Sequence, residues 1–230
     1  MKITYLGQAG LLLETGGLAI LVDPYLSDSV EKVNPKNRRR TPVDPSFLKL
    51  RPDVLLCTHN HLDHLDPETL SHYFTPDVRM TVLAPSGSWE KLRAYSGDNN
   101  YVLFNRHTEW TEGSVRFTAV RAVHSDPGAI GVIISVEGKR WYISGDTLYS
   151  RELLEDLSGS FEAVFLPVNG VGNNMNMADA ARFAAQLDAK YIVPVHIGLF
   201  DGLKGEDFPS PNRVLPEIYR EICFPEEEIQ

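Results

Sequence analysis

The sequence predicts an α/β (α+β) fold in which two β-sheets pack face to face and helices cover their outer faces. Three observations support this prediction. Short apolar runs with turn residues between them recur along the chain, helical patterns are fewer, and in each half the strands come first and the helices follow. The length is enough to bury a sizeable core, so we expect a single domain over residues 1–230.

The predicted strands are apolar runs bounded by turn residues such as Gly, Pro, Asn and Asp. They cover residues 2–6, 10–14, 18–23, 53–58, 80–84, 115–123, 130–136, 140–144, 162–168 and 190–195. The helical patterns cover residues 67–74, 87–95, 151–157, 177–188 and 212–222. Asp66 and Pro67 form a capped start for the first helix. Asn176 can cap the fourth, with Asp179 at the capping-box position.

Composition indicates a globular protein, with 43% hydrophobic and 23% charged residues and a net charge of -9. This acidity argues against a basic surface for nucleic acid. The chain opens directly into a strand pattern, with neither a signal-peptide core nor a run long enough to cross a bilayer. Two cysteines, Cys57 and Cys223, are too few for a disulfide framework. We therefore expect a cytoplasmic location, free thiols and no membrane or nucleic-acid partner.

The segment from His59 to His64, His-Asn-His-Leu-Asp-His, carries the strongest chemical signal. It places four metal-ligand side chains on the loop between a predicted buried strand and a predicted helix. A loop at a strand end can direct such closely spaced side chains toward one point. A single catalytic zinc usually takes three protein ligands and a water, so four ligands in one loop suggest more than one ion.

Further ligands are expected at the ends of later strands. His124, Asp146 and His196 each follow an apolar, strand-like run. Imidazole and carboxylate ligands suit Zn, Mn or Fe, and no thiolate is present in the set to favour zinc alone. The sequence leaves the identity of the metal open.

The ordered pattern resembles that of the metallo-β-lactamase superfamily. Its elements here are Asp23, the run Thr58–His64, His124, Asp146 and His196, and the resemblance spans nearly the whole chain. It implies a four-layer αβ/βα sandwich with two divalent metal ions. It also implies that Asp23 and Thr58 lie beneath the site, where Asp23 orients a ligand without binding metal.

The resemblance further implies a division of the ligands. His59, His61 and His124 hold the first ion, Asp63, His64 and His196 hold the second, and Asp146 bridges both. A hydroxide shared by the two ions then attacks the substrate. Asp63 is the residue expected to orient the hydroxide and pass a proton, which gives Asp63 and Asp146 catalytic roles.

Several segments are similar to the L-ascorbate-6-phosphate lactonase-like group of this superfamily. They are residues 40–45, 142–150, 187–196 and 213–218. This chain is shorter than those lactonases and lacks their long insertion before Gly145 and Asp146. The similarity implies hydrolysis of a lactone or other carboxylic ester. The alternatives are a phosphodiester substrate, a flavin-linked di-iron oxidoreductase and a non-catalytic binding protein.

The expected substrate is a small molecule, and a phosphorylated sugar acid fits the lactonase-like segments. The same group implies a homo-oligomer. Residues 27–52 form a long Pro-rich segment with a basic run, which is a substrate lid, an oligomer contact or a solvated basic loop. Arg39 in this run can bind a phosphate or carboxylate. Asn176, after a polar Gly-containing loop, is a second expected substrate contact at a helix N-terminus.

Overall fold

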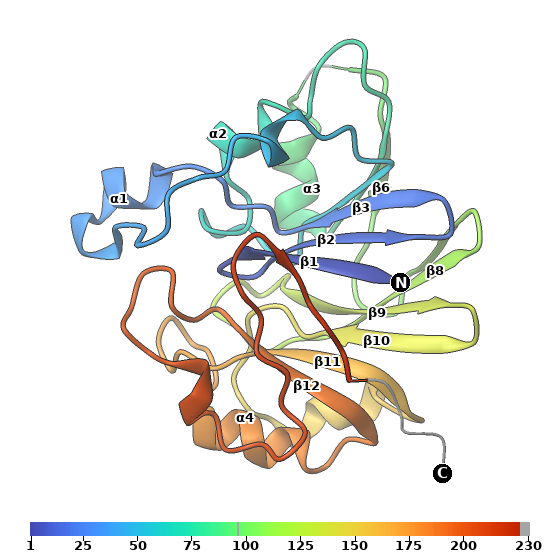
Figure 1. The fold of residues 1–230 in the computed structure, drawn as a ribbon. Coiled ribbons are helices and arrows are strands. Elements are labelled where there is room, and N and C mark those ends of the chain that lie inside the picture. The colour runs from blue at the N-terminus through green and yellow to red at the C-terminus, as the bar shows by residue number, and fades with distance from the viewer. Residues whose placement is uncertain (96, 226–230) are drawn as a thin grey trace.

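A computed structural model describes residues 1–95 and 97–225 (Figure 1). Two mixed β-sheets face each other, with α2 and α3 outside the first sheet and α4 outside the second. The predicted α+β sandwich is therefore confirmed. The α-helices are α1 (Ser29–Val33), α2 (Pro67–Leu70), α3 (Ser86–Leu92) and α4 (Met177–Ala184). Short 3₁₀ helices cover Pro35–Asn37, Phe47–Lys49, Arg151–Asp156 and Gly205–Asp207.

The first sheet has the strand order β13-β1-β2-β3-β4-β5-β6. Its strands are β1 (Lys2–Gly7), β2 (Gly10–Thr15), β3 (Leu18–Val22), β4 (Val54–Leu56), β5 (Thr81–Ala84), β6 (Asn100–Leu103) and β13 (Arg220–Glu221). The pairs from β3 to β6 are parallel, while β13, β1, β2 and β3 pair antiparallel. The carboxyl ends of β3 and β4 therefore meet at one edge of the sheet.

The second sheet has the order β12-β11-β10-β9-β8-β7. Its strands are β7 (Glu109–Glu112), β8 (Val115–Arg121), β9 (Ile130–Val136), β10 (Lys139–Ile143), β11 (Phe161–Pro167) and β12 (Ala189–Val195). Strands β10, β11 and β12 are parallel to one another, and the remaining pairs are antiparallel. The carboxyl ends of β10 and β12 consequently open toward the same side.

The layers are held together by separate apolar clusters on the two faces of each sheet. In β4, Val54 and Leu56 join the cluster between the sheets, whereas Leu55 joins the cluster beneath α2 and α3. In β11, Phe165 packs between the sheets and Val164 packs with the cluster that includes Phe183 of α4. Successive side chains of a strand point to opposite faces, so these two strands are buried on both sides.

All strands predicted from apolar runs are present, but three short strands were not predicted. These are β6, β7 and β13. The first two have only intermediate or exposed residues, and they lie near or at sheet edges. An apolar pattern is weak where neither face of a strand is fully buried.

The predicted helix over 212–222 is wrong. Val214, Ile218 and Ile222 repeat every four residues, which fits a helix but also one face of an extended chain. The backbone N–H groups of Val214 and Ile222 donate to Ile192 and Ile3, respectively. The segment therefore lies extended against the sheets, and Pro216, which has no N–H, interrupts any helix there.

Other helices are present but shorter than predicted. The pattern over 67–74 gives α2 at Pro67–Leu70, and the pattern over 151–157 gives a 3₁₀ helix. Both predicted caps are confirmed. The Asp66 carboxylate accepts from the backbone N–H groups of Glu68 and Thr69, and Asn176 accepts from Asp179 at 2.9 Å.

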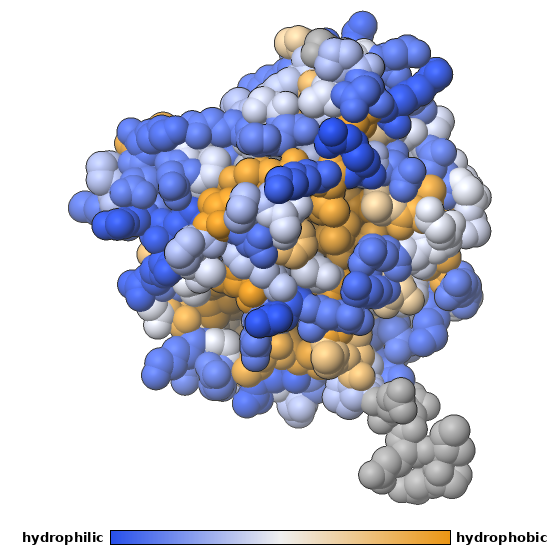
Figure 2. Space-filling model, turned by 45° about the horizontal axis from the view of Figure 1, so that its top comes forward, coloured by the Kyte–Doolittle hydropathy of each residue, from blue (hydrophilic) through white to orange (hydrophobic). Residues whose placement is uncertain are grey.

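Hydrophilic residues cover most of the face shown in Figure 2, with apolar residues gathered between them.

Both cysteines are free thiols, as predicted, with Cys57 buried and Cys223 exposed. Across residues 1–95 and 97–225, no helix has the length and apolar character needed to cross a membrane.

A partly buried carboxylate ties the second sheet to the 3₁₀ helix at Arg151–Asp156. Asp156 accepts hydrogen bonds from Arg106 Nε at 2.7 Å, Arg106 NH2 at 2.9 Å and the Arg121 backbone N–H at 2.8 Å. The hydrogen bonds from Arg106 hold the pKa of Asp156 well below its usual range, although burial opposes the shift.

Asp156→Asn is expected to reduce the free energy of unfolding at pH 7 by about 1–3 kcal/mol. A carboxylate with a lowered pKa in the folded state stabilises the protein above the unfolded-state pKa of about 4 and loses this contribution as pH falls further. Urea unfolding at pH 7 and near pH 3 measures both effects, and the difference between variant and wild type should narrow at the lower pH. Glu155→Gln, at a side chain that is 59% exposed, is the matched control. Equal destabilisation by the two variants would contradict this role of Asp156.

Candidate metal centre

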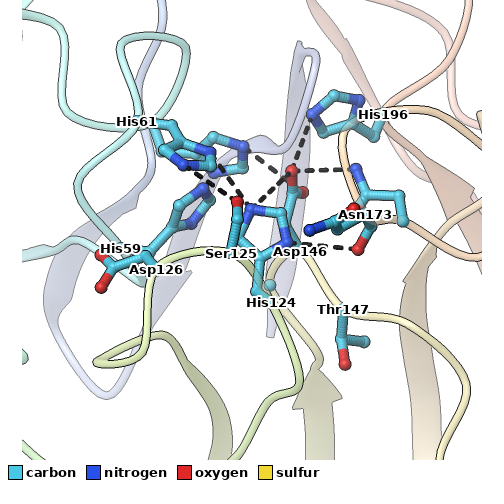
Figure 3. Close-up of polar contacts among 12 residues, drawn as sticks. His59, His61, His124, Ser125, Asp126, Asp146, Thr147, Asn173 and His196 are labelled. Carbon is cyan, nitrogen blue, oxygen red and sulfur yellow. Dashed lines mark hydrogen bonds and ion pairs between the residues drawn. The ribbon is translucent and has the colours of Figure 1, made fainter.

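The predicted ligands lie at the carboxyl ends of strands from both sheets. The run from His59 to His64 follows β4, and His124 follows β8. Asp146 follows β10, and His196 follows β12 directly. Figure 3 shows His59, His61, His124, Asp146 and His196 directed toward one another. The structure thus brings together residues that are far apart in the sequence.

One group consists of three histidines. One ring nitrogen from each of His59, His61 and His124 lies within 4.8 Å of the other two, close enough to hold one metal ion. His124 Nε2 lies 3.1 Å from His61 Nδ1, and the other His124 nitrogen lies 3.2 Å from the Asn173 carbonyl oxygen. A partner on the second nitrogen fixes the ring's orientation, which is a usual property of metal-binding histidines.

A second group combines a carboxylate with two buried histidines. Ligand atoms of Asp63, His64 and His196 also lie within 4.8 Å of one another. His196 Nε2 is 3.1 Å from Asp63 Oδ2. Both groups contain residues that the sequence resemblance assigned together, and Asp23, His59 and His64 form a third, overlapping group.

Asp146 lies between the triads. Its Oδ1 is 3.4 Å from His64 Nε2, and its Oδ2 is 3.2 Å from His196 Nε2. Oδ2 is also 4.0 Å from His124 Nε2, in the other triad. One carboxylate therefore approaches ligands of both groups.

The donor set fits a cation. His59 Nε2, His64 Nε2 and Asp146 Oδ1 are buried and have no hydrogen-bond partner within the described residues. Buried polar atoms without a partner are costly, and most proteins avoid them. These three atoms belong to residues of the two triads or lie between them, so divalent cations held there would satisfy all of them. The nitrogen and oxygen donors suit Zn, Mn or Fe.

Asp23 lies beneath the ligands and is fully buried. Its Oδ1 accepts from the Thr58 backbone N–H at 2.7 Å, and its Oδ2 accepts from the Thr58 hydroxyl at 2.6 Å. Oδ2 also lies 2.8 Å from His64 Nδ1, which leaves His64 Nε2 for the site. The Thr58 hydroxyl is in turn 3.1 Å from His59 Nδ1. Asp23 and Thr58 thus contact the candidate ligands His64 and His59 from below.

Burial and charge have opposite effects on the imidazoles. Burial lowers the pKa of His59, and the neighbouring His64 lowers it further, which favours the neutral, ligating form. Burial also opposes the charge of His196, but Asp146 and Asp63 outweigh it and raise the pKa of His196 to about 9. A cation that binds His196 must therefore displace a proton, so metal affinity at this position falls as pH is lowered.

The structure adds three amides that sequence reasoning missed. Gln8 Nε2 donates to Asp63 Oδ2 at 2.7 Å, and Asn174 Nδ2 donates to Asp146 Oδ2 at 2.9 Å. Asn169 Nδ2 lies 2.9 Å from His196 Nδ1. Asn169 and Asn174 belong to the polar loop before Asn176, which was a usable signal. Gln8, in the turn between β1 and β2, carried no such signal.

Asp126 is another residue that was not predicted. Its side chain is buried and accepts from the Asn60 backbone N–H at 3.0 Å and from the Gly128 N–H at 2.9 Å. It connects the histidine loop to the segment that carries His124, and Figure 3 shows it beside His59.

The two expected substrate contacts have other partners. The Arg39 guanidinium donates to the Tyr25 carbonyl at 2.9 Å, the Tyr219 hydroxyl at 2.7 Å and the Thr41 carbonyl at 3.2 Å. Asn176 caps α4. Neither residue lines the cavity described next, so the structure gives both a role in holding the chain. Substrate contact by either one stays a prediction from sequence alone.

A cavity of about 450 Å³ opens beside the ligands. Its lining includes ligands of the second triad, Asp146, three of the surrounding amides and several apolar side chains. The lining residues are Gln8, Val30, Asn37, His61, Asp63, Asp146, Asn169, Val171, Gly172, Asn174, His196, Phe200 and Asp201. The cavity can hold a small molecule against the candidate metal centre.

Comparison with known proteins identifies the class to which this fold and site belong. Residues 19–197 match the model of the beta-lactamase superfamily domain. A UPF0173 metal-dependent hydrolase of Geobacillus thermodenitrificans is 32% identical over 215 residues, covering 87% of each chain. A second, from Ligilactobacillus salivarius, is 30% identical and covers 95% of this chain and 97% of its own. The structure of Igni18, a metallo hydrolase from Ignicoccus hospitalis, covers 98% of this chain and 99% of its own, with a TM-score of 0.73 and 19% identity.

The metallo-β-lactamase fold expected from the sequence is therefore confirmed. This chain belongs to the beta-lactamase superfamily and, within it, to the UPF0173 family of metal-dependent hydrolases. The lactonase-like group is a finer assignment than these similarities support.

Proposed function

We propose that the protein is a binuclear hydrolase that cleaves a lactone or other carboxylic ester of a small molecule. The observation that carries this proposal is the pair of triads with Asp146 between them, placed at the wall of a cavity. The lactonase-like segments of the sequence favour an ester over other acyl substrates.

The chain's own residues supply a path for the proton. When bound, two divalent cations lower the pKa of water toward neutrality and polarise the attacked oxygen. Asp63 lines the cavity, so its carboxylate can take a proton from the attacking water and release it to the departing alkoxide. Gln8 donates to Asp63 Oδ2 and thereby holds this carboxylate in place. Asp23 holds His64 from below.

The candidate ligands differ in how deeply they are buried. His59 and His64 are fully buried and are fixed by Thr58 and Asp23. His61 and Asp63 are more exposed and lie at the cavity. The buried ligands thus form a rigid base, and the more exposed ones face the substrate.

A phosphodiesterase is the second candidate, because the same ligands can bind an anionic phosphoryl centre. Elemental analysis of the purified protein, followed by a turnover screen, distinguishes the candidates. The metal-loaded protein is offered lactones, p-nitrophenyl acetate, thioesters and bis-p-nitrophenyl phosphate, before and after removal of metal with a chelator.

We expect close to two transition-metal ions per chain, turnover of an ester or lactone, and loss of turnover on chelation that added Zn or Mn restores. Activity confined to the phosphodiester would favour the second candidate. Full activity after complete metal removal would contradict both.

A further inference from the structure

We infer that the cavity takes a substrate whose non-reacting part is uncharged and carries hydroxyl groups, such as a sugar lactone without a phosphate. This inference rests on the proposed ester hydrolysis and names its substrate class. It comes from the charges and hydrogen-bonding groups of the cavity wall.

Away from the candidate metal ligands, the wall has no cationic side chain. No Lys or Arg of the described chain is among the lining residues, although Asn37 directly precedes the basic run Arg38–Arg40. The guanidinium of Arg39 is bound to Tyr25, Thr41 and Tyr219 instead. A phosphate or carboxylate on the remote part of a substrate would therefore meet none of the charged donors that recognise such groups.

The wall does have an anionic side chain away from the metal ligands. Asp201 Oδ1 accepts from the Gly198 backbone N–H at 2.9 Å and from the Leu203 N–H at 3.0 Å. These two bonds fix the side chain of Asp201, which is one of the lining residues. A second negative charge within a few ångströms would be disfavoured, by about tenfold in affinity for a partly solvated pair.

Amides and apolar groups make up the remaining wall. Asn174 donates through Nδ2 to Asp146, so this bond directs its Oδ1 elsewhere. The amide residues of the lining are Gln8, Asn37, Asn169 and Asn174. A hydroxyl group can both donate to an amide oxygen and accept from an amide N–H, whereas phosphate and carboxylate oxygens can only accept. Val30 and Phe200 provide an apolar side that suits the carbon skeleton of a sugar.

The test compares two substrates that differ in one charged group. D-Glucono-1,5-lactone and its 6-phosphate are offered to the metal-loaded enzyme, and kcat/KM is measured for each after subtraction of spontaneous hydrolysis. We expect the uncharged lactone to be favoured by at least about tenfold. Equal values, or a preference for the phosphate, would overturn the inference.

Asp201→Asn is the informative variant, because the asparagine Oδ1 can still accept from Gly198 and Leu203. This variant should narrow the preference for the uncharged lactone by roughly three- to tenfold, mainly by raising kcat/KM for the 6-phosphate. Asp207→Asn, at an exposed residue outside the cavity, should leave the preference unchanged. An equal effect of the two variants would contradict the role of Asp201.

A binding measurement separates this inference from the proposed function. Calorimetry with the corresponding lactam and lactam 6-phosphate, which resist hydrolysis, reports the same preference without turnover. Tighter binding of the uncharged lactam supports the inference even if no ester is cleaved. The absence of ester cleavage would contradict only the proposed reaction. Equal or tighter binding of the phosphate would overturn the inference even if esters are cleaved.

Discussion

Replacing Asp146 with asparagine is expected to lower turnover by about 10³-fold and to reduce the bound metal. The carboxylate oxygens lie 3.2–4.0 Å from ligand nitrogens of both triads, so one substitution removes a negative charge from the position between them. Asparagine preserves the shape of the side chain but not its charge. Steady-state kinetics and elemental analysis on the same preparation measure the two effects together.

Asp98→Asn provides a control for the charge change itself, because Asp98 is 88% exposed and far in sequence from every ligand. It should leave both turnover and metal content at the wild-type level. Circular dichroism shows whether Asp146→Asn remains folded. A folded Asp146→Asn protein with normal turnover and a full metal complement would contradict the bridging position.

The convergence of the candidate metal ligands could be predicted, because both their residue types and their positions after strands indicate one site. His59, His61 and His64 are concentrated in one loop, and the remaining imidazoles and carboxylate follow apolar runs that end at the same side of the sheets. Strands buried on both faces give strong sequence patterns, so β4 and β11 were predicted and their ends could be located.

Weak or ambiguous patterns explain the errors in the fold. Edge strands such as β7 have no fully buried side chain, so their apolar pattern is weak. A four-residue repeat fits both a helix and one face of an extended chain. Residues 212–222 were therefore predicted as a helix, whereas their N–H groups bond to distant strands. Pro216 is a signal against a helix in the sequence, and the positions of Ile3 and Ile192 show where the extended segment binds.

The supporting amides could not be predicted, because Gln and Asn are common in turns and carry no ligand signature. Gln8 reaches Asp63, which is 55 residues away in the sequence. Arg39 illustrates the converse. A guanidinium in a basic loop suggests an anion-binding site, but the hydroxyl of Tyr219, 180 residues later, accepts a hydrogen bond from it. Sequence alone shows which donors exist and not which acceptors reach them.

Asp63→Asn is expected to lower turnover by roughly 10²–10⁴-fold, the usual loss when a general acid or base is removed. Asparagine can neither take a proton from the attacking water nor pass one to the leaving alkoxide. Its side-chain oxygen can still occupy the position 3.1 Å from His196 Nε2, so metal content should fall less than in Asp146→Asn. Kinetics with the substrate found in the screen, together with elemental analysis, test this difference.

Gln8→Met is the companion variant, because it leaves the Asp63 carboxylate intact and removes only the amide that donates to it at 2.7 Å. A residue that merely positions a ligand typically contributes about 10–100-fold, so this variant should lose less activity than Asp63→Asn. Wild-type turnover by a fully metallated Asp63→Asn protein would show that the proton takes another route. A larger loss of turnover in Gln8→Met than in Asp63→Asn would contradict the assignment of the proton transfer to Asp63.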